Sequence, residues 1–384
     1  MRIPAPLRAT LTPTAVLRLV LGWGSVLLLS AFGPSSPAGL PTPVLWLLLA
    51  GVVVVITISS FGVVTEAEHL AHRLGDPYGT LVLTLSIAGI EVILISAVML
   101  GPGEHTTIAR DSVMAVSMII LNLVVGVALL VAAHRRRDLR VNSTGFTQYL
   151  GMLIVLLSAV FALPALIGED GSYTPAQAIP LILLTLGLYA FFLARQMGVQ
   201  RTDFQELPDI ASTRTPSSTS DEVRPPIAAV LRQHRAELIT RTVMLIVMVL
   251  PVVLLSHEMA ALLDDGLERL GAPVALSGVL IAMIVFLPET ITTIRAAVAG
   301  EMQRVSNLCH GALVSTAGIT IPAVLTIGLL TGQTVLLAET PTNLLLLGAT
   351  LLLTLATFAG RRATAVHGAT HLFMFVLYGL SVFS

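Results

Sequence analysis

The chain has 384 residues, of which 55% are hydrophobic and only 11% are charged. Soluble domains carry about 25% charged residues, so this composition argues against a soluble globular protein. The 21 basic residues, all of them arginine, nearly balance the 22 acidic ones, which leaves no net positive field to attract nucleic acid. The single cysteine, Cys309, excludes an internal disulfide and any multi-thiolate metal centre within one chain.

Apolar runs dominate the sequence, and a bilayer span needs about 20 such residues in a helix. The first run follows Arg2 and Arg8, and the absence of a small-x-small cleavage site after it favours a retained span over a secretory signal. We therefore predict an all-α polytopic membrane protein with eleven transmembrane helices. In chain order the runs are 15–32, 43–64, 78–100, 112–133, 147–167, 176–194, 238–256, 273–299, 305–330, 341–360 and 366–384.

Arginine placement predicts the orientation, because cytoplasmic flanks hold the positive charge. With the N-terminus inside, 19 of the 21 arginines fall on the cytoplasmic side, and only Arg110 and Arg269 fall outside. The cluster 135–137 is interpreted as a topology anchor that also contacts lipid head groups. The pattern predicts a cytoplasmic N-terminus and an external C-terminus.

A polar stretch at 196–237 interrupts the apolar runs. Its Ser/Thr-rich segment and Pro225-Pro226 cannot build a core, so we interpret it as a disordered cytoplasmic linker. The predicted organisation is an extra N-terminal helix in 1–40, a first unit of five spans in 41–195, the linker, and a second unit of five spans in 238–384.

The two units each carry a similar segment. Arg-Leu-Gly-Asp-Pro at 73–77 precedes one span, and Arg-Leu-Gly-Ala-Pro at 269–273 precedes another. Glu91 lies 14 residues after the first proline and Glu289 lies 16 after the second. Because five is odd, the second unit enters the membrane upside down relative to the first, which is the inverted repeat of many secondary transporters.

Glu91 and Glu289 are the two acids, among 22, that lie centrally in apolar runs. A carboxyl group at bilayer depth costs a few kcal/mol and marks an ion or proton pathway, although a protonated acid in a helix contact is the alternative. Gly89 precedes Glu91, and Pro288 precedes Glu289. Since proline lacks an N–H and crowds the carbonyl four residues back, we expect a kink or break beside Glu289.

Other polar side chains could complete an all-oxygen shell for a hard cation. Helical spacing puts some of them on the faces of the two acids, and others lie centrally in the following spans. Hydroxyl groups that bond their own helix carbonyls are the alternative reading. A buried, unpaired carboxyl favours its neutral form and a bound cation favours its ionised form, so proton and cation would compete for the site. The candidates are Thr84, Asn122, Thr292, Thr293, Ser315 and Thr316.

The segments 68–75 (Glu-His-Leu-Ala-His-Arg-Leu-Gly) and 77–81 (Pro-Tyr-Gly-Thr-Leu), followed by Glu91, resemble the first repeat of calcium/proton antiporters in the cation/calcium exchanger superfamily. The span with Pro288-Glu289 and the segment 311–322 resemble the second repeat. The likeness covers spans 2–11 and is closest to bacterial ChaA-type antiporters. The family's usual motif is Gly-Asn-x-x-Glu. Both repeats of this chain lack the asparagine of that motif, so the choice between calcium and monovalent cations as the transported ion stays open.

The resemblance implies a secondary transporter in the bacterial cytoplasmic (inner) membrane. It would export calcium, sodium or potassium against protons by alternating access, with Glu91 and Glu289 as the ligands of the transported metal ion. No cofactor is implied beyond the transported Ca²⁺, Na⁺ or K⁺ and H⁺. The implied partners are inorganic cations, protons and the lipid bilayer, without nucleic acid. Glu68 and Glu66 match an acidic position of the family and would deliver ions, or form a solvated helix end.

Two rival functions stay open, a sodium-driven calcium exchanger and an intramembrane enzyme acting on a lipid or peptide. His257-Glu258 begins like a zinc protease motif, but the second histidine is missing. Glu258 is interpreted instead as part of an acidic outer vestibule, or of a plain solvated loop. His310 is interpreted as a packed histidine in preference to a proton relay. The sequence leaves the ion preference, stoichiometry, oligomeric state and resting conformation open.

Overall fold

The computed structural model describes residues 12–33, 37–74, 106–135, 139–207, 232–360 and 362–383, together with scattered helical positions between 85 and 99. Within these residues the regular structure is helical, apart from isolated bridges that join Ser172 to Glu169 and Leu336. The predicted all-α fold class is confirmed.

Nine helices in the described residues are long and apolar enough to cross a membrane, and each overlaps a predicted run. The predicted run 273–299 is divided into α12 (Val274–Val285) and α13 (Leu287–Ala299), with a bend of 54° between them. The predicted run 78–100 lies largely outside the described residues, so the total of eleven stays a prediction. The nine are α2 (Pro13–Phe32), α3 (Thr42–Leu74), α5–η2–α6 (Ile108–Met118, Ile119–Val124, Val125–Arg135), α7–η3–α8 (Ser143–Leu157, Ser158–Ala162, Leu163–Ile167), α9 (Pro175–Met197), α11 (Arg235–Arg269), α14–η6–α15 (Met302–Ser315, Thr316–Thr320, Ile321–Thr331), α16 (Pro341–Phe358) and α17 (Ala365–Val382).

A Thr-Pro pair starts three of these helices. Thr12 and Thr340 accept hydrogen bonds of 3.2 Å from the backbone N–H groups of Ala15 and Asn343, and Thr174 forms a capping box with Gln177. Proline follows at the first helical position, where its missing N–H has no partner to lose. The helix starts are thus encoded locally.

Two long spans form the centre of the molecule. In α5–η2–α6 and α14–η6–α15, 83% and 67% of the most apolar stretch is buried, more than in the other seven. Each contains a π-helical turn, η2 or η6, in which one extra residue enters the helix. Such turns are rare and concentrate at functional sites.

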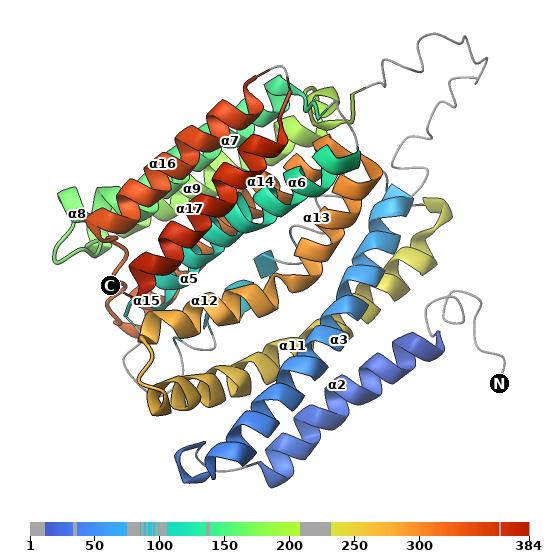
Figure 1. Ribbon diagram of the computed structural model, residues 1–384, viewed down its shortest axis with the longest axis vertical. Helices are drawn as coiled ribbons and strands as arrows, with labels where there is room; N and C mark the ends of the chain where they lie inside the picture. The colour runs from blue at the N-terminus through green and yellow to red at the C-terminus, as the bar shows by residue number, and fades with distance from the viewer. Residues whose placement is uncertain are drawn as a thin grey trace.

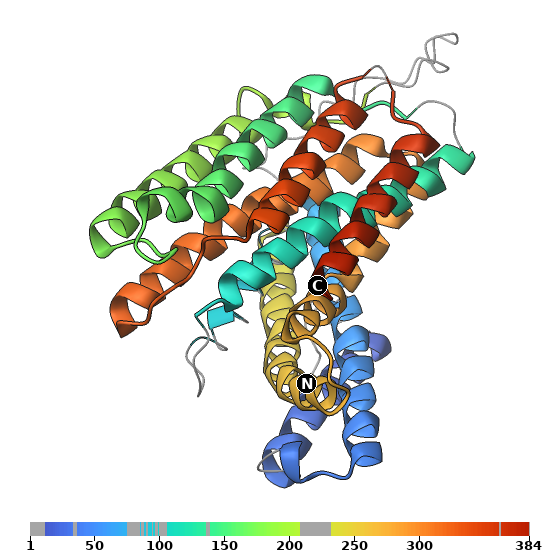
Figure 2. The same ribbon diagram turned by 60° about the vertical axis from the view of Figure 1, so that its left-hand side comes forward.

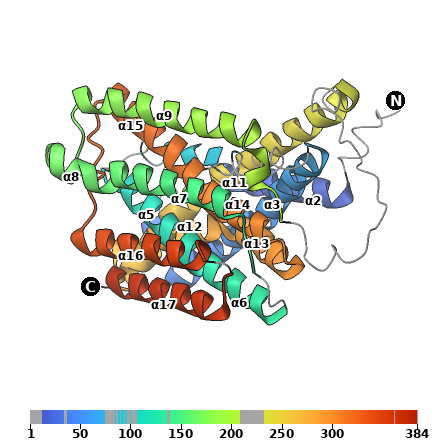
Figure 3. The same ribbon diagram turned by 90° about the horizontal axis from the view of Figure 1, so that it is seen from above.

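The helices α2, α3 and α11 lie side by side as one group, apart from α6, α16 and α17 (Figure 1). Figure 2 shows that this group extends beyond the remaining helices, and Figure 3 shows α9 and α17 at opposite sides of the molecule. The N-terminal helix α2 makes its main contacts with α3 and α11. Trp23 of α2 donates its indole N–H to the carbonyl of Val247 in α11 at 3.1 Å.

Buried charges join α3 to α11 at one end. Arg241 contacts Glu66 at 3.0 Å and Glu237 at 3.2 Å, and Glu237 also contacts Arg73 at 3.3 Å. The side chains of Arg241 and Glu66 are 9% and 6% exposed. Because each buried charge has an opposite partner, this end of the pair is held in one register.

The predicted linker is ordered at both of its ends, which corrects its boundaries. The short helix η4 (Arg201–Phe204) follows α9, and α11 begins at Arg235. Phe204 is 1% exposed and its ring packs against Tyr149 and Phe192. The sequence missed this docking because one phenylalanine among polar residues gives no periodic signal.

Candidate functional site

Glu289 lies in the first turn of α13, beside the break in the span. α12 ends at Val285 because Pro288 has no N–H for the carbonyl of Ile284, and a new helix starts at the next residues. Phe286 takes helical angles between the two segments, and its carbonyl accepts hydrogen bonds of 2.9 Å from both the N–H and the hydroxyl of Thr290. The sequence predicted a break at this position.

Glu91 reaches η6 of the other half of the chain. Its side chain is 3% exposed, and Oε2 accepts a hydrogen bond of 2.5 Å from the Thr316 hydroxyl. The predicted acid and one predicted hydroxyl ligand are therefore in contact. The two residues are 225 positions apart in the sequence, so this is a tertiary contact between the two predicted repeats.

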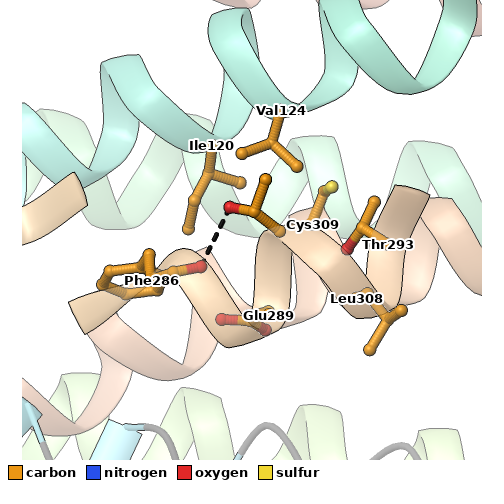
Figure 4. A pocket seen from close by; sticks show the side chains of 8 residues that line it. Ile120, Val124, Phe286, Glu289, Thr293, Leu308 and Cys309 are labelled. Carbon is orange, nitrogen blue, oxygen red and sulfur yellow. Dashed lines mark hydrogen bonds between the residues drawn. The ribbon is translucent and has the colours of Figure 1, made fainter. Parts of the chain in front are cut away.

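A small pocket lies against Glu289 (Figure 4). Its lining comes from η2, from α13 and from α14, and its polar groups are the side chains of Glu289, Thr290, Thr293 and Cys309. The hydroxyl of Thr290 is already bonded to Phe286. The remaining lining residues are Ile120, Val124, Phe286 and Leu308.

Both carboxyl groups are buried, with Glu91 3% and Glu289 6% exposed. In the described residues, both oxygens of Glu289 and Oε1 of Glu91 are buried without a hydrogen-bond partner. Buried carboxylate oxygens require a donor, a proton or a cation, since burial removes them from water. The described part of the chain contains no cluster of three or more His, Cys, Asp or Glu side chains for a resident metal.

Asn122, predicted as an ion ligand, makes its side-chain contacts with α16 and α17. Its amide N donates to Thr350 of α16 at 2.9 Å, and its oxygen lies 3.3 Å from Nδ1 of His371 in α17. Nε2 of His371 lies 3.0 Å from the hydroxyl of Thr357. Asn122 thus faces a second polar cluster, and in this structure it contacts neither acid.

The other predicted ligands are divided between several partners. Ser315 shares a hydrogen bond of 2.8 Å with Tyr189 of α9. Thr292 donates to Glu68 at 3.5 Å, whereas Thr293 faces the pocket of Glu289. Thr84 lies outside the described residues. Gly89 is helical, and no atom of the described residues lies within 4 Å of where its Cβ would be.

The three acids predicted to lie along the ion path, Glu66, Glu68 and Glu258, have different surroundings. Glu66 is neutralised by Arg241 at 3.0 Å, so its charge is committed to the α3–α11 contact. Glu68 is partly buried beside Thr292 of α13, and Glu258 is exposed on α11. His310 is fully buried, bonded to Ser306 at 3.0 Å and packed against the rings of Phe146 and Phe358. These contacts agree with the packed interpretation of His310.

Four pocket residues had no functional signal in the sequence: Ile120, Val124, Leu308 and Cys309. Three are ordinary apolar residues of a span, and the cysteine has no spacing partner. The tertiary packing of η2 and α14 against α13 places them beside Glu289.

The comparisons agree with this architecture. The family described as sodium/calcium exchanger protein matches residues 44–198 and 240–383. The sodium-potassium/proton antiporter ChaA of Escherichia coli is 30% identical over 331 residues, which are 85% of this chain and 86% of that protein. The y4hA protein of Sinorhizobium fredii is 33% identical over 338 residues, 87% of each chain.

A solved structure has the same fold at much lower identity. The H⁺/Ca²⁺ exchanger CAX superposes with a TM-score of 0.65 at 14% identity, covering 95% of this chain and 87% of that one. The long apolar helices show that this is a multi-pass membrane protein. The matched family consists of exchangers, so the chain is a secondary transporter and not an enzyme. The chain belongs to the sodium/calcium exchanger family and is a cation exchanger.

Proposed function

We propose that this chain is a cation/proton antiporter that exports calcium, sodium or potassium in exchange for protons. The observation that carries the proposal is the pair Glu91 and Glu289, both buried and with three of their four carboxyl oxygens unpartnered in the described residues. Such oxygens are satisfied either by protons or by a cation. Because protons and the cation compete for the same oxygens, transport of the cation in one direction is coupled to transport of protons in the other.

An inverted repeat of two five-span units supplies the alternating access. The π-helical turn η2 begins 28 residues after Glu91, and η6 begins 27 residues after Glu289. The two stretches matched by the family also leave out 199–239, between the proposed units. Both facts support units at 41–195 and 238–384, with an extra helix before them and eleven spans in all.

The arginine distribution supports the proposed orientation, with a cytoplasmic N-terminus, an external C-terminus and placement in the inner membrane. The linker then lies in the cytoplasm. Glu66 and Glu237, paired with Arg241 and Arg73, lie on the cytoplasmic side, and Glu258 lies towards the outside.

The candidates for the transported ion are calcium, sodium and potassium. Calcium is supported by the name of the CAX structure, and sodium and potassium by that of ChaA. Two carboxylates and a hydroxyl suit any of these hard cations. Each ion is therefore tested separately.

The test is exchange in everted membrane vesicles under an imposed pH gradient, with calcium, sodium and potassium assayed one at a time. We expect exchange of at least one ion in the wild type and its loss in Glu91→Gln and in Glu289→Gln, with both variants folded. Glu268→Gln, at an exposed position of α11, is the matched control and keeps exchange. Calcium exchange that requires sodium would favour the sodium-driven alternative, and near-normal exchange in both site variants would exclude the site.

A further inference from the structure

The π-helical turn η6 rests on Tyr189, a side chain of α9. The hydroxyl of Tyr189 shares a hydrogen bond of 2.8 Å with that of Ser315, the residue before η6. The ring of Tyr189 lies against Gly318, where an added Cβ would come within 2.9 Å of two ring carbons. The turn is therefore fixed on α9 at two points that are three residues apart.

Two consecutive hydroxyl groups at the start of this turn have different partners. Ser315 bonds Tyr189, and Thr316 donates to Oε2 of Glu91 at 2.5 Å. Hydroxyl groups inside helices commonly donate to the carbonyl four residues back, as that of Ser117 does at 2.7 Å. At the start of η6 both hydroxyls instead reach side chains of other helices. The turn that is bonded to α9 thus also holds Glu91.

The bond between Tyr189 and Ser315 is buried. Their exposed fractions are 5% and 2%, and that of Thr316 is 1%. A buried hydroxyl that loses its partner is destabilising, so this bond restricts the rotation of Ser315 about the helix axis. Because Thr316 is the next residue of the same turn, the direction of its hydroxyl towards Glu91 is restricted as well.

The sequence predicts Ser315 as an ion ligand, and in this structure its hydroxyl is engaged by Tyr189. The two roles have different consequences. If Ser315 binds the ion itself, its contribution to cation binding is independent of the Tyr189 hydroxyl. If Ser315 instead transmits the position of α9 to η6, removal of either hydroxyl has the same effect, and removal of both adds nothing.

We infer that Tyr189 is a positioning residue for cation binding, which acts through Ser315 to hold the Thr316 hydroxyl against Glu91. The inference rests on the proposed role of Glu91 as a cation ligand and deepens it. It extends the site to α9, a helix that contributes no side chain to the described pocket of Glu289.

Removal of the two bonded hydroxyl groups tests the inference. Tyr189→Phe keeps the ring against Gly318, and Ser315→Ala removes the partner. Exchange is measured in everted vesicles, with calcium, sodium and potassium in separate assays. Each variant is expected to raise the KM for the exchanged cation about threefold to tenfold, the range that one hydrogen bond spans, with the maximal rate within about twofold of wild type. The double variant should have the KM of either single variant.

The variant Thr316→Val shows through which group Tyr189 acts. It removes the hydroxyl that meets Glu91, so it raises the KM by itself. In this background Tyr189→Phe should change the KM by less than about twofold, because the positioned group is no longer present. A general loss of packing would raise the KM equally in both backgrounds.

Tyr149→Phe is the matched control. Tyr149 is also a buried tyrosine, and its hydroxyl accepts a hydrogen bond of 2.6 Å from Gln196 of α9. This variant should melt at a lower temperature and keep the wild-type KM.

The inference is overturned by a wild-type KM in Tyr189→Phe, by effects of Tyr189→Phe and Ser315→Ala that multiply in the double variant, or by an equal rise of the KM in Tyr149→Phe. If Tyr189→Phe does not fold, Ser315→Ala is compared in the wild-type and Thr316→Val backgrounds. An effect of equal size in both would show that Ser315 is a ligand and overturn the inference. Absence of pH-driven exchange of all three ions in the wild type would instead refute the antiport, and the same variants are then compared in sodium-driven calcium exchange.

Discussion

The indole of Trp23 donates a hydrogen bond of 3.1 Å to the one backbone carbonyl that Pro251 leaves without its helical donor, that of Val247. Pro251 lies inside α11, four residues after Val247, and has no N–H to offer. The ring of Pro251 also packs on Gly22, where an added Cβ would come within 3.0 Å of it. The N-terminal helix α2 thus supplies the hydrogen-bond donor that Pro251 cannot offer within α11.

We predict that Trp23→Phe lowers the free energy of unfolding by about 1 kcal/mol, because it leaves a partly buried carbonyl unsatisfied. Thermal unfolding of the purified protein in detergent measures this loss. Pro251→Ala restores the N–H, so the same Trp23 substitution should cost clearly less in that background. Equal costs in the two backgrounds would show that the contact with Val247 contributes nothing.

A second prediction concerns Glu206, in the described segment that follows η4. Glu206 accepts hydrogen bonds from the N–H groups of Gln303 at 3.0 Å and Arg304 at 3.3 Å, at the start of α14, whose own N-cap residue Glu301 makes no such bond. Glu206→Ala should lower stability by about 1 kcal/mol, as loss of a cap does. Glu206→Gln keeps an acceptor and should lose less. Identical melting temperatures for the wild type and the alanine variant would contradict the cap.

The contact between α3 and α11 provides a third prediction. Arg241→Met leaves Glu66 buried without its partner, and breaking such a pair costs about 3–5 kcal/mol. The double variant Glu66→Gln/Arg241→Met should recover much of that stability, because no unpaired charge remains. The comparison is made by unfolding in detergent. A double variant no more stable than Arg241→Met would indicate that the pair is not the source of the loss.

The fourth prediction is a pH dependence at Glu339, before α16. One of its oxygens accepts from Asn343 at 2.9 Å, and the other lies 4.0 Å from Nε of Arg110. Burial raises the pKa of Glu339 above its ordinary value of 4.5. The native state then binds the proton more tightly than the unfolded chain, so this residue lowers stability as pH rises through the interval just above 4.5.

Glu339→Gln lacks this titration. Its melting temperature relative to wild type should therefore increase between pH 4 and pH 7. A difference that stays constant or falls with pH would contradict the burial effect at Glu339.

Much of this fold could be predicted from the sequence, because polar residues in apolar runs are costly and therefore informative. Glu91, Glu289 and the break at Pro288 are examples. The orientations of Asn122 and Ser315 could not be predicted. No local signal marks their contacts, because the partners lie on helices far away in the sequence, Thr350 and His371 for Asn122 and Tyr189 for Ser315.

The apolar part of the site was also beyond prediction. Val124 resembles every other valine in its span, and only the tertiary packing of η2 on α13 places it beside Glu289. Phe204 was missed for a related reason, since its ring partners Tyr149 and Phe192 lie on two different helices, α7 and α9.

Proton release on cation binding tests the central claim most directly. Purified protein in weakly buffered detergent solution is mixed with the ion that vesicle exchange identifies, and the pH change is recorded. If Glu91 and Glu289 hold proton and cation in competition, the wild type releases protons on binding, and both Glu91→Gln and Glu289→Gln lose that release. Cation binding without proton release in the wild type, or unchanged release in both variants, would contradict the account.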